Sequence, residues 1–98
     1  MKSIIQEDND KCFLCGGGCG LEPLDRHHIF SGSNRKWSEK YGLTVYLHHD
    51  KCHIFGKNSV HANREIRDKL CAYAQKIAMK YYGWTKEDFI KIFGRSWI

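Results

Sequence analysis

The sequence predicts a small α+β domain, in which a two-stranded hairpin comes first and helices follow. The 98 residues fit one domain, 1–98, and leave little room for a second. Residues 43–47 have the sequence LTVYL, whose β-branched and aromatic side chains favour a strand. Apolar residues at spacings of three and four across 60–82 indicate an amphipathic helix instead. Cysteines and histidines are concentrated in turns beside the expected hairpin.

The first half of the chain alternates short elements with polar and glycine-rich turns. We expect residues 1–10 to be a frayed tail and residues 24–30 to form the first strand. A short helix over 35–41 should end at Gly42, because glycine is the commonest residue just after a helix. Closure of the hairpin then brings the turn before the first strand close to the turn at 48–53.

The second half of the chain should be helical. Gly83 ends the long helix, Thr85 begins another with Asp88 as its capping-box partner, and Gly94 ends that one. Cys71 falls within the long helix, and we expect it to be a packed residue and not a metal ligand. We expect the aromatic side chains Trp84, Phe89, Phe93 and Trp97 to be packed as well. The basic residues of the long helix should form a solvated face; they include Arg64, Arg67, Lys69 and Lys76.

Charge and hydropathy narrow the possible partners. The 16 Lys and Arg residues outnumber the 11 Asp and Glu residues, and a net charge of +5 favours a polyanion such as nucleic acid. No stretch is apolar enough to cross a membrane, and the polar, acidic N-terminus lacks the apolar segment of a signal peptide. We therefore expect a cytoplasmic protein without a membrane partner, in a reducing compartment where clustered cysteines bind metal more often than they form disulfides.

Two ligand-rich turns predict a structural zinc site. Cys12 and Cys15 have C-x-x-C spacing, and Cys52 follows His49 by three residues. Two thiolates from the first turn, with a thiolate and an imidazole from the second, make a tetrahedral zinc set. His48 is the alternative to His49. Cys19 is a further candidate for the fourth ligand. Another possibility is that Cys12 and Cys15 form a redox pair, although no βαβ pattern surrounds them.

A second set of histidines surrounds the same strands. His27 and His28 are adjacent, so in a strand their side chains point to opposite faces. His53 directly follows Cys52, and His61 lies eight residues further on. Histidines grouped in this way around one hairpin indicate a second metal site or a catalytic site.

The residues that carry this pattern resemble the HNH endonucleases, which share the ββα-metal fold. The segments DRHHIF (25–30), RKWSEKYGLTVYLHHDKCH (35–53) and GKNSVHANRE (56–65) are similar to small HNH-like proteins of phages and prophages, as is the tail TKEDFIKIFGRSWI (85–98). The resemblance implies a zinc-containing, treble-clef ββα-metal core over 12–63. A C-terminal helical extension then covers 64–98.

The resemblance also implies an activity and roles for the histidines. It implies hydrolysis of DNA phosphodiester bonds with Mg²⁺ or another divalent cation, in a bacterial or phage-infected cell. His27 matches a metal ligand, His28 the general base, and His53 the last metal ligand, while His61 could add a ligand or a phosphate contact. The basic residues beside these turns could hold the DNA backbone: Arg26, Arg35, Lys36 and Lys57.

One position departs from the family pattern. The middle Asn of the motif should fall about nine residues before His53, where this chain has Thr44, or Leu43 if the turn carries one extra residue. The alternative function is therefore a treble-clef module that binds nucleic acid or protein without catalysis, with a role in phage recombination, packaging or defence.

Overall fold

The computed structural model describes residues 2–6, 11–13, 24–48 and 63–98. In this part of the chain, strand β1 (Leu24–His28) is followed by a 3-10 turn, η1 (Gly32–Asn34), and helix α1 (Arg35–Tyr41). Strand β2 (Thr44–His48) and helices α2 (Arg64–Tyr82) and α3 (Lys86–Phe93) complete the order. The α+β class, the hairpin and the C-terminal helices are as the sequence predicts. None of the described helices has the length and apolar character that a membrane crossing needs.

The two strands form an antiparallel pair in which His27 lies opposite Val45 and His28 opposite Thr44. The first strand ends two residues earlier than predicted. Ser38 of α1 explains this difference, because its hydroxyl binds both backbone groups of Phe30: Oγ accepts from Phe30 N at 3.0 Å and donates to Phe30 O at 2.8 Å. Phe30 therefore leaves the ladder, and its ring turns into the core.

Local capping signals fix the helix ends. Gly42 (φ +72°) and Gly83 (φ +70°) follow α1 and α2 in the left-handed conformation that glycine adopts without strain. The capping box of α3 is present, with Thr85 and Asp88 exchanging hydrogen bonds. The long helix was predicted from residue 60. Its first described turn begins at Arg64, where the side chain of Asn63 accepts a hydrogen bond from Ile66 N.

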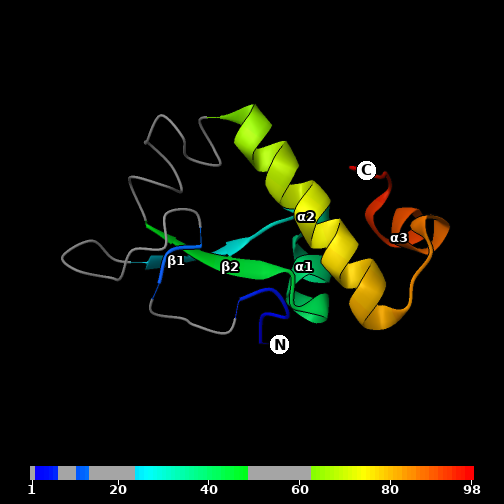
Figure 1. Ribbon diagram of the computed structural model, residues 1–98, viewed down its shortest axis with the longest axis horizontal. Coiled ribbons are helices and arrows are strands. Elements are labelled where there is room, and N and C mark those ends of the chain that lie inside the picture. Colours follow the sequence, from blue (N-terminus) through cyan, green and yellow to red (C-terminus); the bar gives the residue numbers. More distant parts are fainter. Residues whose placement is uncertain (1, 7–10, 14–23, 49–62) are drawn as a thin grey trace.

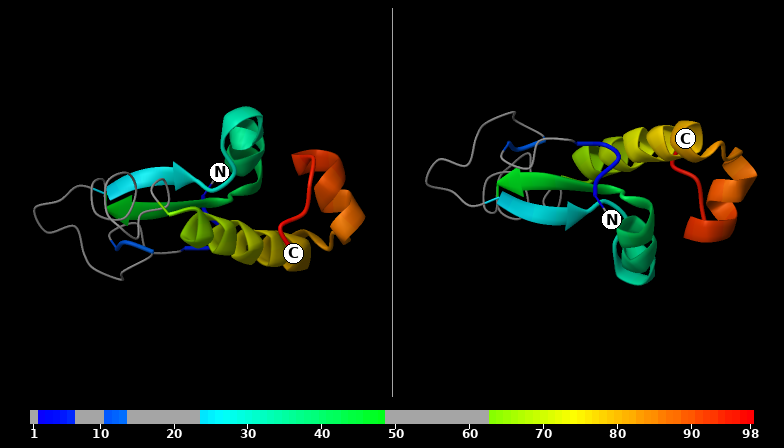
Figure 2. Two further views of the ribbon diagram at one scale, coloured as in Figure 1. Left: turned by 90° about the horizontal axis from the view of Figure 1, so that it is seen from above. Right: turned by 90° about the horizontal axis from the view of Figure 1, so that it is seen from below.

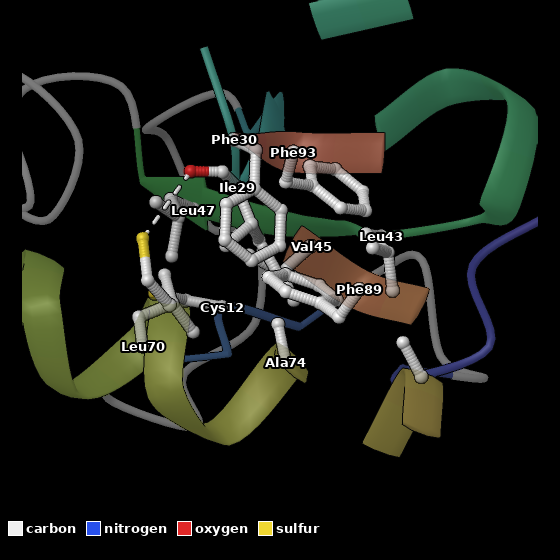
Figure 3. Packing of buried hydrophobic residues seen from close by; sticks show 12 residues of the cluster. Cys12, Ile29, Phe30, Leu43, Val45, Leu47, Leu70, Ala74, Phe89 and Phe93 are labelled. Carbon is white, nitrogen blue, oxygen red and sulfur yellow. Dashed lines mark hydrogen bonds between the residues drawn. The ribbon is translucent and has the colours of Figure 1, made fainter. Parts of the chain in front are cut away.

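Helices α1 and α2 lie on opposite sides of the hairpin (Figure 2). Helix α2 runs across one face of the hairpin, and α3 lies near the C-terminal end of α2 (Figure 1). Between these layers lies one apolar core, to which β2 contributes Val45 and Leu47 and α2 contributes Leu70 and Ala74 (Figure 3). Burial of this core is the main stabilising contribution to the domain.

The aromatic residues of the C-terminal half pack as predicted. Phe30 contacts Phe89, Phe93 and Trp97 with ring centroids 4.7–5.5 Å apart. Trp84 instead packs against the end of α1, with its ring 4.8 Å from Tyr41. The C-terminal extension is thus part of the same core as the hairpin.

The N-terminal residues do not form the frayed tail that their polar sequence predicts. Residues 2–6 lie along the outer edge of β2, where Gln6 Oε1 accepts from Tyr46 N at 2.7 Å and Ser3 Oγ donates to Thr44 O at 2.5 Å. Residues 11–13 continue this arrangement, since Phe13 N donates to Tyr46 O at 2.8 Å. This segment satisfies backbone groups that would otherwise form an open sheet edge.

Candidate functional site

The two adjacent histidines point to opposite sides of the hairpin, as their places in β1 predict. His27 shares the face of Val45 and is 7 % exposed, on the side that α2 covers. His28 is the last residue of β1 and contacts Glu39 of α1, on the other side. The dipeptide therefore connects two different environments, a buried one under α2 and a half-buried polar one beside α1.

The hydrogen bonds of His28 fix the orientation and the tautomer of its ring. Arg35 Nε lies 3.4 Å from His28 Nδ1, and a guanidinium can only donate, so Nδ1 is the acceptor. In the neutral ring the proton is then on Nε2, which donates to Glu39 Oε2 at 3.1 Å. Arg26 Nη1 and His28 Nε2 both donate to Glu39 Oε2, and for this reason the two nitrogens lie only 3.5 Å apart.

Glu39 is held in its charged form at this site. Arg26 Nη1 lies 2.5 Å from Glu39 Oε2, and this hydrogen bond is the main cause that lowers the pKa of the Glu39 carboxyl. Desolvation by burial is the next largest effect and raises this pKa, while the hydrogen bond from His28 lowers it. At neutral pH Glu39 is therefore an anionic acceptor for the imidazole.

Around this pair lies an open hollow of about 440 Å³ lined by Arg26, His28, Arg35, Lys36 and Glu39. Three cations face one carboxylate here, so the hollow carries net positive charge. Lys36 Nζ lies 4.9 Å from the centre of the Trp37 ring, which supports its side chain. The structure thus brings together three of the four basic residues that the sequence suggests for DNA contact. The fourth, Lys57, lies outside the described residues.

Sequence reasoning missed Glu39. Its only local signal is its position four residues after Arg35, which places both side chains on one face of α1. That this face meets His28 follows from the packing of α1 on the hairpin and not from the spacing.

Of the residues expected to bind the structural zinc, the structure describes only Cys12 and His48. Cys12 is 1 % exposed and lies in the core, in the segment that runs beside β2. His48 is the last residue of β2, where it pairs with Leu24, and so belongs to the strand rather than to the following turn. Among the described residues no group of three or more His, Cys, Asp or Glu side chains could hold a metal ion. The other expected metal ligands and their alternatives lie outside the described residues: Cys15, Cys19, His49, Cys52, His53 and His61.

The position expected for the middle Asn of the motif is taken up by strand β2. Thr44 is 1 % exposed and sits directly opposite His28, while Leu43 is fully buried. The Thr44 hydroxyl makes no hydrogen bond within the described part of the chain. Thr44, at the position where the HNH pattern has Asn, is therefore a direct cross-strand neighbour of His28.

Comparison of the chain with protein-family models, with curated protein sequences and with solved structures finds no match.

Proposed function

We propose that this protein is a metal-dependent endonuclease that hydrolyses phosphodiester bonds in DNA. The observation that carries the proposal is the hydrogen-bonded pair of His28 and Glu39 inside a cationic hollow at the end of β1. An oriented imidazole can take the proton of an attacking water, and the surrounding cations can bind a phosphate beside it.

In this mechanism Glu39 acts on His28 as a positioning residue. By accepting from Nε2 it keeps the lone pair on Nδ1, which is the atom that removes a proton from water. The carboxylate also stabilises the imidazolium that results. Arg35 Nε lies 3.4 Å from Nδ1, a long distance for a hydrogen bond. A DNA phosphate that binds Arg35 would draw its guanidinium away and leave Nδ1 accessible to water.

The basic side chains of the hollow bind the backbone of the substrate. Arginine presents a planar fork that matches two phosphate oxygens, while lysine contributes a point charge. Arg26 is oriented by Glu39 and Lys36 by Trp37, so both side chains lose little freedom when DNA binds. The net charge of the chain, +5, attracts the same polyanion over longer distances.

The proposal includes two metal sites, and the residues fit both by their chemistry. Cys12, with Cys15, Cys52 and His49, would hold a structural zinc and so join the segment beside β2 to residues that follow this strand in the sequence. His48 is the alternative ligand. His27, buried on the α2 side of the hairpin, would hold the catalytic cation together with His53. A divalent ion held there would supply Lewis-acid stabilisation of the leaving oxygen. Because His27 and His28 point to opposite faces of the hairpin, the ion and the imidazole would act on one phosphate only at the end of β1, where the strand stops.

A plasmid-cleavage assay tests the proposal. Supercoiled DNA is incubated with the protein and Mg²⁺, Mn²⁺ or Ni²⁺, beside a His28→Ala variant and a Lys80→Ala variant, which changes an exposed residue of α2 outside the hollow and serves as the control. We expect nicked or linear DNA from the wild-type chain, and loss of cleavage in His28→Ala. No cleavage with any of the metals, or equal cleavage by the His28→Ala variant, would contradict the proposal.

A DNA-binding module without catalysis is the second candidate. The observation that favours it is the absence of a carboxamide at Leu43 and Thr44, where the family pattern has Asn. This candidate predicts salt-sensitive DNA binding that is unchanged in His28→Ala, and no cleavage in any metal.

A further inference from the structure

A second basic hollow lies on the other side of the loop that follows β1. Its volume is about 180 Å³, and its walls include Ser31 and Asn34 of the loop. Two arginines of α2, Arg64 and Arg67, and one from the C-terminal segment, Arg95, also line it. The sequence predicted only a solvated helix face here, because nothing in the spacing links Arg95 to α2.

The positive charge of this hollow is largely uncompensated. Three guanidinium groups face one carboxylate, that of Asp68, which lies 3.7 Å from Arg64 Nε, a distance too long for a good hydrogen bond. The Arg67 side chain makes no hydrogen bond or ion pair within the described residues. Like charges held together at a folded surface cost free energy unless an anion binds between them.

The third arginine is held in position by buried contacts. Arg95 lies over the ring of Trp97, 4.6 Å from its centre, and Trp97 packs against Phe30 of the core. Gln75 of α2, which is fully buried, fixes this C-terminal segment with both ends of its amide: Oε1 accepts from Trp97 N at 2.7 Å and Nε2 donates to Ser96 Oγ at 2.9 Å. A buried amide with both ends satisfied specifies one conformation for the segment that carries Arg95.

We propose that this hollow is a second phosphate-binding subsite for the DNA backbone. It adjoins the His28 hollow along the chain, because Ile29 and Asn34 line one hollow while their chain neighbours His28 and Arg35 line the other. One strand of DNA lying across this loop would place one phosphate near His28 and another among Arg64, Arg67 and Arg95. The C-terminal extension therefore contributes to the DNA interface. The inference rests on the proposed function for the identity of its ligand.

Salt-dependent binding of a short fluorescent DNA duplex tests the subsite, with affinity measured by anisotropy in the absence of the catalytic cation. Arg67→Gln and Arg95→Gln each remove one charge from the hollow, and Lys80→Gln removes one charge from the exposed last turn of α2. Each lost phosphate contact should reduce the slope of log affinity against log salt by about 0.9. We expect that reduction, with a several-fold loss of affinity at moderate salt, in the two arginine variants and no change of slope in Lys80→Gln.

Equal slopes for Arg67→Gln, Arg95→Gln and Lys80→Gln would overturn the subsite, as would a wild-type chain that does not bind DNA. Arg67→Lys and Arg95→Lys keep the charge and should retain the wild-type slope, which separates loss of a contact from loss of fold. Because binding is measured without cleavage, this result is independent of the nuclease assay. A chain that binds through the arginines but never cuts DNA would contradict the proposed function and leave the subsite intact.

Discussion

Glu39 Oε2 accepts a hydrogen bond from His28 Nε2 at 3.1 Å, and this contact joins the last residue of β1 to helix α1. The same oxygen binds Arg26, so one carboxylate orients both an imidazole and a guanidinium. The proposed chemistry depends on this contact, because it decides which ring nitrogen of His28 carries the proton.

Removal of the Glu39 charge should slow cleavage without weakening DNA binding. We expect Glu39→Gln to lower kcat about 10- to 100-fold, by analogy with the loss seen when the carboxylate that orients a metal-bound histidine is removed. KM should stay unchanged or fall, because the variant makes the hollow more positive. Glu65→Gln, on the exposed part of α2, changes the net charge equally and should leave kcat unchanged. A rise in KM with constant kcat would instead indicate a purely structural role for Glu39.

The N-terminal segment should contribute measurably to stability through Gly42. A Cβ at this position would lie 2.5 Å from Lys2 O, whereas a Cβ at Gly83 would meet nothing within 4 Å. Both glycines have positive φ, so each substitution by Ala costs about 1 kcal/mol of backbone strain. Gly42→Ala should therefore lower the free energy of unfolding more than Gly83→Ala in denaturant titrations. Deletion of residues 1–6 should abolish that difference, and equal costs in the full chain would show that the segment does not dock on β2.

Cys71 should make the protein less stable in alkaline solution. Burial raises the pKa of its thiol to about 11, from an ordinary value of 9.0. Between these values the unfolded chain ionises while the folded chain keeps its proton, so the free energy of unfolding falls as pH rises. The loss approaches about 2 to 3 kcal/mol near pH 11 and vanishes below about pH 8. Denaturant titrations across this range should show the decline in the wild type and a smaller one in Cys71→Ala. Parallel curves for the two proteins would exclude the effect.

Substitution of Cys12 should lower the zinc content of the protein, and substitution of Cys71 should not. Elemental analysis of the purified chain should find about one zinc per molecule, and less in Cys12→Ala, because a structural site loses affinity when one thiolate is removed. Cys71→Ala is the matched control, because the Cys71 thiol is buried in the core and donates weakly to Ile29 O. Less than about half a zinc per wild-type chain would contradict the structural site.

The elements that the sequence predicted are those with local signals. Helix α1 ends at Gly42 as predicted, and α3 has its capping box at Thr85, because these signals act within a few residues. The alternation of β1 likewise predicted the opposite faces of His27 and His28.

What the sequence could not predict depends on contacts between distant segments. Ser3 and Thr44 are 41 residues apart, so no local pattern in the polar N-terminus indicates that it lines β2. The early end of β1 depends on a serine eight residues after Phe30. Glu39 and Arg95 reach their sites only when α1 packs on the hairpin and Gln75 fixes the C-terminal segment.

The central claim is that His28 performs chemistry, and single-turnover cleavage of a labelled duplex tests it most directly. With protein in excess and at saturating concentration, binding does not limit the observed rate, so a substitution acts on the chemical step alone. We predict that His28→Ala cleaves about 10²- to 10⁴-fold more slowly than wild type, the contribution typical of a general base, while its DNA affinity is retained. Equal single-turnover rates for the two proteins would contradict the account.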